Sequence, residues 1–280
     1  MVRPGDRRRN RRPRHRPGDL APPCRPPGQK GDLQPHRIRY WLTPPEDPDF
    51  APKVTDICTL YHAAPALAAV GERVASTDEL TGVQALERKH PGLPPAPGKV
   101  ERREFEYVRH GTSSFILSRD VASGVVLAPF AGPTRTEADF LAHIQAVVAT
   151  DPAAVRWHVV VDNLNTHRSA SLVAWVAAES GLQIDLGRKG QRGILANLAS
   201  RTAFLADPSH RIVFHYTPKH SSWLNQIEIW LGILTRKLLT RGNFTSVADL
   251  QAQVMAFIAY YNRTMAKPFQ WTYRGKTLTA

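Results

Sequence analysis

Apolar residues recur along residues 51–261 in two spacings, one typical of helices and one typical of strands. Apolar positions three and four residues apart predict amphipathic helices, and short β-branched or aromatic runs predict strands. The predicted helices cover residues 51–63, 169–180, 194–205, 224–238 and 247–261, with one more that begins after Thr136. The predicted strands cover residues 74–77, two strands within 105–121, and single strands at 125–130, 156–162 and 211–216. Three early strands followed by alternating helices and strands predict a mixed α/β sheet with helices packed against it.

Local sequence signals support three of these predicted helices. Thr136 is a candidate N-cap because Asp139, which follows three positions later, can accept a hydrogen bond back from the start of the helix. The last two helices have the most regular apolar faces, formed by Leu224, Ile227, Leu231, Leu234 and Leu238 in the first and by Val247, Leu250, Val254, Phe257 and Tyr261 in the second.

The composition is that of a globular chain with an excess of positive charge. The 280 residues are 42% hydrophobic and 22% charged, and 37 Lys and Arg against 24 Asp and Glu give a formal charge of +13. This excess favours a polyanionic partner, either nucleic acid or an anionic membrane surface. No apolar run reaches the roughly 18 to 20 residues of a membrane span, and the start has no apolar stretch typical of a secretory signal. Two cysteines, Cys24 and Cys58, are too few for a disulfide scaffold or a four-cysteine zinc site, so a cytoplasmic location is expected.

The charge is concentrated at the N-terminus. Residues 1–30 contain nine Arg and one Lys against two Asp, which is +8 of the +13, together with seven prolines. With so few large apolar side chains, the tail over residues 1–32 is expected to be disordered. It either binds phosphates without sequence preference or is a solvated tail without a selected role. Residues 31–280 carry only +5, so the function of the body has to be found in its motifs.

Three acidic residues lie where catalysis would need them. Asp162 follows the strand Val159–Val161, at an edge where α/β proteins form ligand crevices, although it could instead cap the next loop. Glu228 follows the core position Ile227 and is either a site residue or a partly solvated helix carboxylate. Asp78 ends the strand at 74–77, and Glu79 beside it points to the opposite side.

Together, Asp78, Asp162 and Glu228 suggest a site for two hard divalent cations. Mg²⁺ prefers oxygen ligands and keeps waters and substrate phosphates in its other positions. Two such ions, about 3.5 to 4 Å apart, can activate a water or a 3′-hydroxyl and stabilise the leaving oxygen at one phosphorus.

Several long strings of this sequence resemble motifs of DDE transposases, in the branch of the mariner-like bacterial insertion-sequence transposases (the insertion-sequence six-thirty family). They are VVVDNLNTHRS at 159–169 and FHYTPKHSSWLNQIEIWLGILTRKLLTRGNFTS at 214–246, with further similar segments at 78–88, 104–112, 132–144 and 261–278. The resemblance covers roughly residues 33–278. It implies an RNase H-like mixed sheet flanked by helices and preceded by the disordered basic tail.

The resemblance also implies a function. Asp78, Asp162 and Glu228 map onto the catalytic and metal-binding triad, with two Mg²⁺ or Mn²⁺ ions. The expected activity is metal-dependent DNA cleavage at insertion-sequence ends and strand transfer into target DNA. The expected partners are double-stranded DNA and further copies of the chain, with no membrane. The spacing of 66 residues between Asp162 and Glu228 is longer than in mariner-like relatives, and the basic segment 186–207 accounts for much of the excess.

One departure from the family concerns the N-terminus. Members carry a helix-turn-helix region before the catalytic domain, whereas residues 33–42 resemble only its last stretch. The expected organisation is therefore a tail at 1–32, a linker and DNA-binding remnant at 33–70, and a catalytic domain at 71–280. A truncated copy is one hypothesis. The alternatives are a non-catalytic DNA-binding remnant and an RNase H-like nuclease without strand transfer.

Basic residues and histidines near the motifs are further candidates. The predicted DNA contacts, each of which could equally belong to a solvated basic surface, are Arg188, Lys189, Arg192, Lys219, Arg236 and Lys237. His167 could approach the metal crevice or play a structural role. His215 and His220, with Asp162, suggest zinc, but the segment has no thiolate or HExxH spacing, so Mg²⁺ is favoured. Trp223 and Trp230 are predicted to pack rather than to stack on bases.

Overall fold

The computed structural model describes residues 48–273, and its centre is a five-stranded sheet in the order β3-β2-β1-β4-β5. The strands are β1 (Glu72–Arg88), β2 (Tyr107–Asp120), β3 (Val126–Gly132), β4 (Arg156–Val161) and β5 (Ile212–Tyr216). The first three strands are antiparallel, whereas β4 and β5 run parallel to β1. The mixed α/β sheet that the sequence predicts is therefore confirmed.

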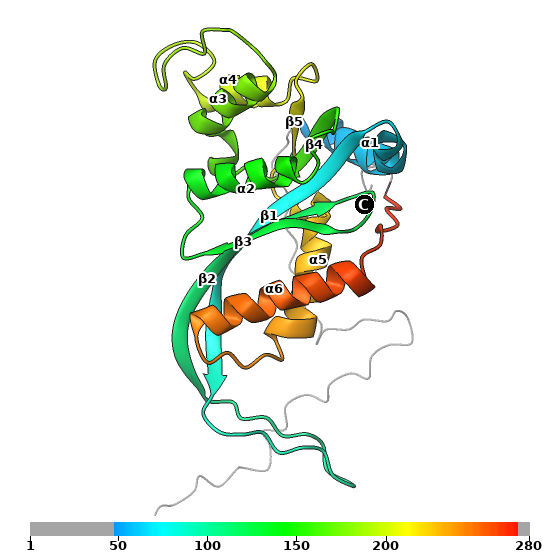
Figure 1. Ribbon diagram of the computed structural model, residues 1–280, viewed down its shortest axis with the longest axis vertical. Coiled ribbons are helices and arrows are strands. Elements are labelled where there is room, and N and C mark those ends of the chain that lie inside the picture. The colour runs from blue at the N-terminus through cyan, green and yellow to red at the C-terminus, as the bar shows by residue number, and fades with distance from the viewer. Residues whose placement is uncertain (1–47, 274–280) are drawn as a thin grey trace, which may run out of the picture. The chain divides into compact units, whose positions relative to one another are not determined.

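Helices pack against both faces of this sheet (Figure 1). The α-helices are α1 (Phe50–Ala69), α2 (Glu137–Ala149), α3 (Ala170–Glu179), α4 (Leu198–Leu205), α5 (Ile227–Leu234) and α6 (Val247–Thr264). Two 3₁₀ turns, η1 (Thr166–Arg168) and η2 (Ser222–Leu224), and a short π-helical segment, η3 (Thr235–Leu239), complete the elements. The predicted cap of α2 is present, because Thr136 and Asp139 form a reciprocal capping box.

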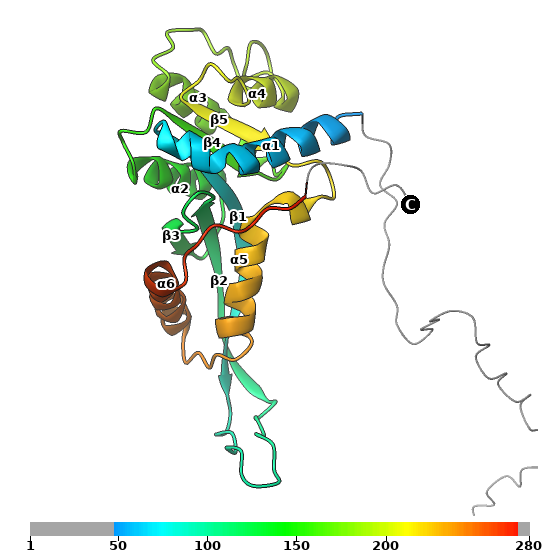
Figure 2. The same ribbon diagram turned by 90° about the vertical axis from the view of Figure 1, so that its right-hand side faces the viewer.

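Alternate residues of the strands separate two cores. Val159 and Val161 of β4 point to one side, where they pack with α2, α3 and α4. Val160, between them, points to the other side and packs with α1, while α5 and α6 cover the rest of that face. Figure 2 shows α1 crossing the sheet at the level of β4 and β5. Because both faces are covered there, the second half of β4, Val159–Val161, is a continuous apolar run, as is typical of strands that are buried on both faces.

The strands β1 and β2 are longer than the pattern indicates. β1 continues from the predicted 74–77 to Arg88, and β2 is one strand where two were expected within 105–121. Gly111, with a φ of +118°, interrupts the apolar pattern without ending β2, since pairing with β1 resumes on both sides of it. Figure 1 shows the two strands continuing together past α6 as a ribbon. Pairing between strands therefore overrides the weak local signal here.

The predicted helix at 224–238 is also only partly correct. Its apolar face is buried at Leu224, Ile227, Leu231 and Leu234, but the α-helix begins only at Ile227. Asn225 has an extended backbone, and the N–H of Ile227 donates to the Ser76 hydroxyl of β1 at 2.9 Å. The helix starts late because these residues bind the sheet instead of one another. The predicted stretch at 194–205 is likewise helical only from Leu198.

The predicted tail at 1–32, and residues 33–47 of the predicted linker at 33–70, lie outside the described residues. Within the described part of the chain, no helix is both long enough and apolar enough to cross a membrane. The strand β1 begins at Glu72, one residue after the expected start of the catalytic domain, and α1, which precedes it, packs on the same sheet.

Candidate active site

Asp78 and Asp162 occupy matching positions on neighbouring strands. The parallel pairing of β1 with β4 runs from Glu72 opposite Arg156 to Ser76 opposite Val160. Asp78 lies two residues after Ser76, and Asp162 lies two residues after Val160. Neighbouring strands lie about 4.8 Å apart, and residues in register share a face, so this pairing brings the two carboxylates to one edge of the sheet.

Glu228 reaches the same edge because the start of α5 is bound to β1. The hydroxyl of Ser76 hydrogen-bonds the side-chain oxygen of Asn225 and accepts the N–H of Ile227. The Asn225 amide donates to the Thr77 carbonyl at 2.8 Å. Glu228 is the next residue after Ile227 and stands in the first turn of α5. These contacts fix the origin of the helix, and with it the position of the third carboxylate.

The three carboxylates influence one another electrostatically. Burial raises the pKa of Asp78 to about 7, and the charges of Asp162 and Glu228 add to the rise. Burial, followed by the charge of Asp162, also raises the pKa of Glu228. Asp78, Asp162 and Glu228 are thus mutual neighbours, although 84 and 66 residues separate them along the chain. A cluster of acids that repel one another in this way is stabilised by any cation that binds it.

His167 is a buried cation beside this cluster. Its Nδ1 lies 2.8 Å from Asp162 and its Nε2 lies 3.0 Å from Glu79, and its side chain is fully buried. Ionised carboxylates only accept hydrogen bonds, so both ring nitrogens must carry protons. Burial alone would lower the pKa of His167, but the hydrogen bonds to Asp162 and Glu79 raise it to about 9. His167 therefore holds Asp162 in place and neutralises part of the acidic charge.

Two functional contacts of this site were not predicted from the sequence. Glu79 lies on the face opposite Asp78, as the strand alternation predicts, yet it reaches Asp162 through His167. Asn225 donates to Asp78 Oδ2 at 3.2 Å. The position of Asn225 three residues before Glu228 was a signal, but its partner lies 147 residues away along the chain. Only the fold brings that pair together.

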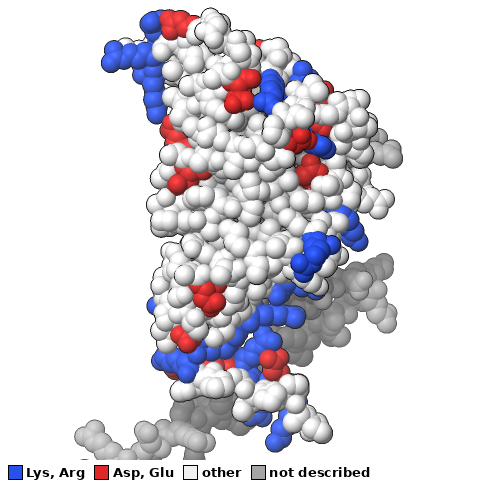
Figure 3. Space-filling model, viewed as in Figure 1, with Lys and Arg blue, Asp and Glu red and all other residues white. Residues whose placement is uncertain are grey.

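The predicted basic contacts lie in separate regions. Arg188, Lys189 and Arg192 are exposed on the loop between α3 and α4. Arg192 pairs with Asp185 at 2.6 Å, and Lys189 lies 3.7 Å from Glu137. Figure 3 shows this loop as a group of positive charges at the upper left, apart from those around the β1–β2 ribbon below. The positive charges of this loop thus lie apart from the other positive groups on this face of the molecule.

The remaining basic candidates are closer to the acidic residues along the chain. Lys219 is exposed just after β5, on the segment that leads to α5. Arg236 and Lys237 are exposed on η3, directly after the helix that carries Glu228. The two tryptophans differ: Trp230 is fully buried, as predicted, whereas 48% of Trp223 is exposed.

The donor set fits a hard divalent cation. Carboxylate oxygens are the ligands that Mg²⁺ prefers. Repulsion among the three carboxylates would be relieved by a cation bound between them. Within residues 48–273, no group of three or more His, Cys, Asp or Glu side chains is arranged to hold one ion by itself. An ion held by Asp78, Asp162 and Glu228 would therefore have to draw further ligands from water and substrate.

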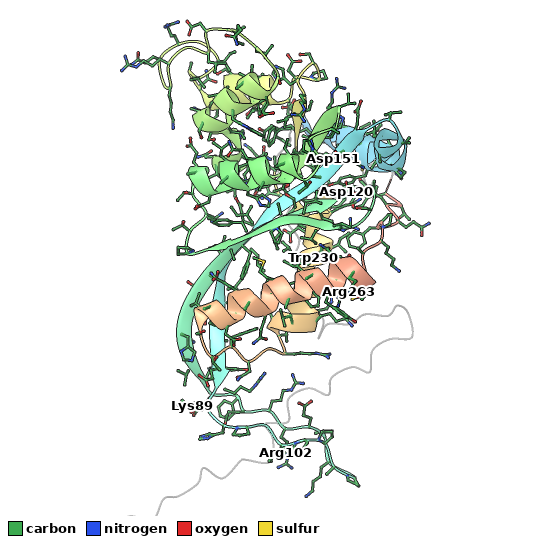
Figure 4. All side chains as sticks on the ribbon, in the orientation of Figure 1. Lys89, Arg102, Asp120, Asp151, Trp230 and Arg263 are labelled. Carbon is green, nitrogen blue, oxygen red and sulfur yellow. The ribbon has the colours of Figure 1, made fainter. Side chains whose placement is uncertain are left out.

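The clearest hollow lies away from these carboxylates. A cavity of about 460 Å³ is lined by residues that include Arg73, Asp120, Asp151 and Trp157. Figure 4 labels Asp120 and Asp151, which lie close together beside β1. None of the predicted site residues lines it.

The order of the strands in the mixed sheet, with helices on both faces, defines an RNase H-like fold. Residues 73–251 match the family described as DDE superfamily endonuclease. This match covers more than half of the chain and includes β1, β4 and α5. The chain belongs to the DDE superfamily endonuclease family.

Comparison with solved structures gives the same fold. The mariner Mos1 paired-end complex with Mn matches with a TM-score of 0.50 at 14% identity, over 83% of this chain and 62% of that one. A pre-cleavage Mos1 transpososome matches with a TM-score of 0.48 at 12% identity, over 83% of this chain and 63% of that one. The chain thus spans less than two thirds of the Mos1 chains in these two complexes. No curated protein matches it.

Proposed function

We propose that this protein is a DDE transposase of the insertion-sequence six-thirty family, which cleaves DNA at insertion-sequence ends and joins the freed ends to target DNA. The proposal rests above all on one observation. Asp78 lies in β1, Asp162 directly follows β4 and Glu228 lies in the first turn of α5, yet burial together with the charges of Asp162 and Glu228 raises the pKa of Asp78. Membership in the DDE superfamily endonuclease family supports phosphodiester hydrolysis as the reaction.

In this proposal the three carboxylates are the metal ligands. Asp78 in β1 and Asp162 directly after the neighbouring β4 would hold two Mg²⁺ or Mn²⁺ ions, and Glu228 would complete the second position. When bound, the ions would supply activation of water or of a 3′-hydroxyl and stabilisation of the leaving oxygen. The similar Mos1 paired-end complex is a complex with Mn, which supports the choice of cation without fixing it for this chain.

Neighbouring residues keep these carboxylates in place. His167 Nδ1 forms an ion pair with Asp162 Oδ1 at 2.8 Å, and the backbone N–H of Leu164 donates a hydrogen bond to the same oxygen at 2.9 Å. Asn225 and the N–H of Glu79 hydrogen-bond Asp78, at 3.2 and 2.8 Å. Preorganised ligands lose little freedom on binding substrate, and this favours reaction at a fixed phosphorus.

The proposed partner is double-stranded DNA. The positive side chains of the α3–α4 loop and of η3 would contact phosphates, and this binding would weaken as salt rises. The proposed contacts are Arg188, Lys189, Arg192, Lys219, Arg236 and Lys237. The similar Mos1 structure is a paired-end complex, which supports pairing of DNA ends and assembly of several copies here as well.

Two assays test the proposal and separate the alternatives. Purified protein should nick plasmid DNA with Mg²⁺ or Mn²⁺ and should not do so in EDTA. A non-catalytic DNA-binding protein would shift the DNA in a gel but never nick it. A duplex with a pre-cut 3′-hydroxyl end should then be joined to target DNA. Nicking without joining would indicate an RNase H-like nuclease and contradict the assignment as a transposase.

A further inference from the structure

The C-terminal segment, residues 266–273, follows α6 and contacts several elements around the start of α5. Its burial alternates: Phe269, Trp271 and Tyr273 are half-buried, whereas the residues between them are exposed. This alternation is typical of an extended chain that lies with one face on the protein. Figure 2 shows the segment, in red, running from the end of α6 towards α1. It belongs to the stretch 261–278, which resembles a family motif but contributes none of the three candidate carboxylates.

One route of contacts from this segment passes through Arg119 of β2, whose side chain is fully buried. The guanidinium donates to the Lys267 carbonyl at 2.7 Å and to the side-chain oxygen of Gln226 at 3.1 Å. Its carbon also lies 3.7 Å from the centre of the Phe269 ring. A buried cation is costly unless hydrogen bonds and an aromatic ring compensate for the lost water. Arg119 therefore couples the C-terminal segment to Gln226.

A second route reaches the same residue through α1. The ring of Trp271 packs edge-on against Tyr61, with the ring centres 5.0 Å apart. The Tyr61 hydroxyl accepts the backbone N–H of Gln226 at 3.2 Å. Because the first N–H groups of a helix have no partner within the helix, such an acceptor helps to fix where the helix begins. Both routes end on Gln226, which directly precedes α5 and lies two residues before Glu228.

We propose that Arg119 is a positioning residue for Glu228 and that the C-terminal segment holds Arg119 in place. Asn225 and Ile227 are bound to β1, and Gln226 between them is bound by Arg119 and Tyr61. Arg119 acts through Gln226 and contacts neither metal nor DNA. The inference rests on the proposed function where it concerns metal binding. Loss of the aromatic contacts of the segment then loosens the start of α5 and weakens the hold of Glu228 on a metal ion.

The first measurement is hydrogen exchange of the full-length protein without metal, followed by mass spectrometry. In Phe269→Ala, the backbone amides at the start of α5 should exchange at least tenfold faster than in the wild type. Trp271→Ala interrupts the second route and should have the same effect, so the test stands even if one variant does not fold. Phe269→Tyr keeps the ring and should exchange like the wild type. The matched control is Tyr107→Ala, because Tyr107 also lies beside an arginine, Arg88, at 5.7 Å, but on the β1–β2 ribbon. It should leave these amides unchanged.

The second measurement is Mn²⁺ binding by electron paramagnetic resonance, counting only the binding that Asp162→Asn abolishes. Phe269→Ala should bind Mn²⁺ about tenfold more weakly, as when a residue that supports metal ligands is lost. Phe269→Tyr and Tyr107→Ala should bind it like the wild type.

The two measurements separate the possible failures. A wild type without this Mn²⁺ binding would contradict the proposed function, and hydrogen exchange would still decide the role of the C-terminal segment. Unchanged exchange at the start of α5 in both alanine variants would overturn the positioning role of Arg119. Faster exchange with unchanged Mn²⁺ affinity would overturn it as well.

Discussion

The side-chain amide of Asn225 donates one hydrogen bond to the Thr77 carbonyl at 2.8 Å and another to the Asp78 carboxylate at 3.2 Å. Asn225 is fully buried and leads into α5, the helix that carries Glu228. One residue thus sets the position of two of the three carboxylates. It is a positioning residue, because it contacts Asp78 and would not itself contact DNA.

We expect Asn225→Ala to lower the nicking rate at least tenfold and to destabilise the fold by about 1–3 kcal/mol, since it leaves buried partners without hydrogen bonds. Nicking assays and urea unfolding measure the two effects. Asn262→Ala is the matched control, because Asn262 bonds the N–H and carbonyl of Val126 away from the acidic edge. The control should lose stability but keep its rate per folded molecule. An equal loss of rate in both variants would contradict the positioning role.

Replacement of His167 should destabilise the fold, because it leaves the buried carboxylate of Glu79 without its closer ion-pair partner. The Glu79 side chain is only 1% exposed, and its other cationic neighbour, Arg135, lies 3.7 Å away. His167→Gln should therefore cost about 3–5 kcal/mol, as expected when one partner of a buried ion pair is lost. The double variant Glu79→Gln with His167→Gln should regain part of that loss. Additive effects of the two changes in urea unfolding would show that the pair is not coupled.

His143 should make stability depend on pH. It is 2% exposed, and burial lowers its pKa from 6.5 to about 4. Because the pKa of His143 is lower in the folded protein than in the unfolded protein, protons bind preferentially to the unfolded protein at low pH. The free energy of unfolding is therefore at its full value above about pH 6.5 and decreases as the pH falls towards 4. The total is about 3 kcal/mol, at about 1.36 kcal/mol per pKa unit. Urea unfolding of the wild type should weaken over this range relative to His143→Gln. Parallel curves would refute the prediction.

The two tryptophans next to Glu228 should differ in their effect on stability. Trp230, labelled in Figure 4, is fully buried against Phe257 and Tyr261. Trp230→Ala should cost about 3–5 kcal/mol, as for other large aromatic residues in a core. Trp223 is 48% exposed, so Trp223→Ala should change stability by less than about 1 kcal/mol. Thermal unfolding of both variants measures the difference, and similar shifts would contradict the packing described for α5.

The elements that were predicted well are those with local signals. The apolar run at 156–162 becomes β4, and Thr136 caps α2, because both depend on residues close in sequence. The long ribbon after Asp78 was missed, since pairing with β2 maintains it despite Gly82 and the irregular register near Val83. The late start of α5 was missed for a similar reason: Ser76 of β1 competes for its first N–H.

In the candidate site, too, residues that belong to local motifs were predicted, and contacts between residues distant in sequence were missed. Motif resemblance selects Asp78, Asp162 and Glu228, and the register of β1 with β4 is consistent with the first two being neighbours. The roles of Glu79 and Asn225 depend on partners 88 and 147 residues away, respectively, which no local pattern encodes. The six basic candidates remain predictions, because exposure alone does not distinguish a phosphate contact from a solvated side chain.

The central claim is that Asp162 is part of a metal-dependent phosphodiester site, and the most direct test is plasmid nicking by Asp162→Asn in Mg²⁺ or Mn²⁺. Asp207→Asn is the control, since Asp207 is an exposed loop residue whose carboxylate hydrogen-bonds Ser209 within its own turn. Both variants should keep the circular dichroism spectrum of the wild type. The account predicts that Asp162→Asn loses nicking at least a thousandfold while Asp207→Asn keeps it; nicking by Asp162→Asn at the wild-type rate would contradict it.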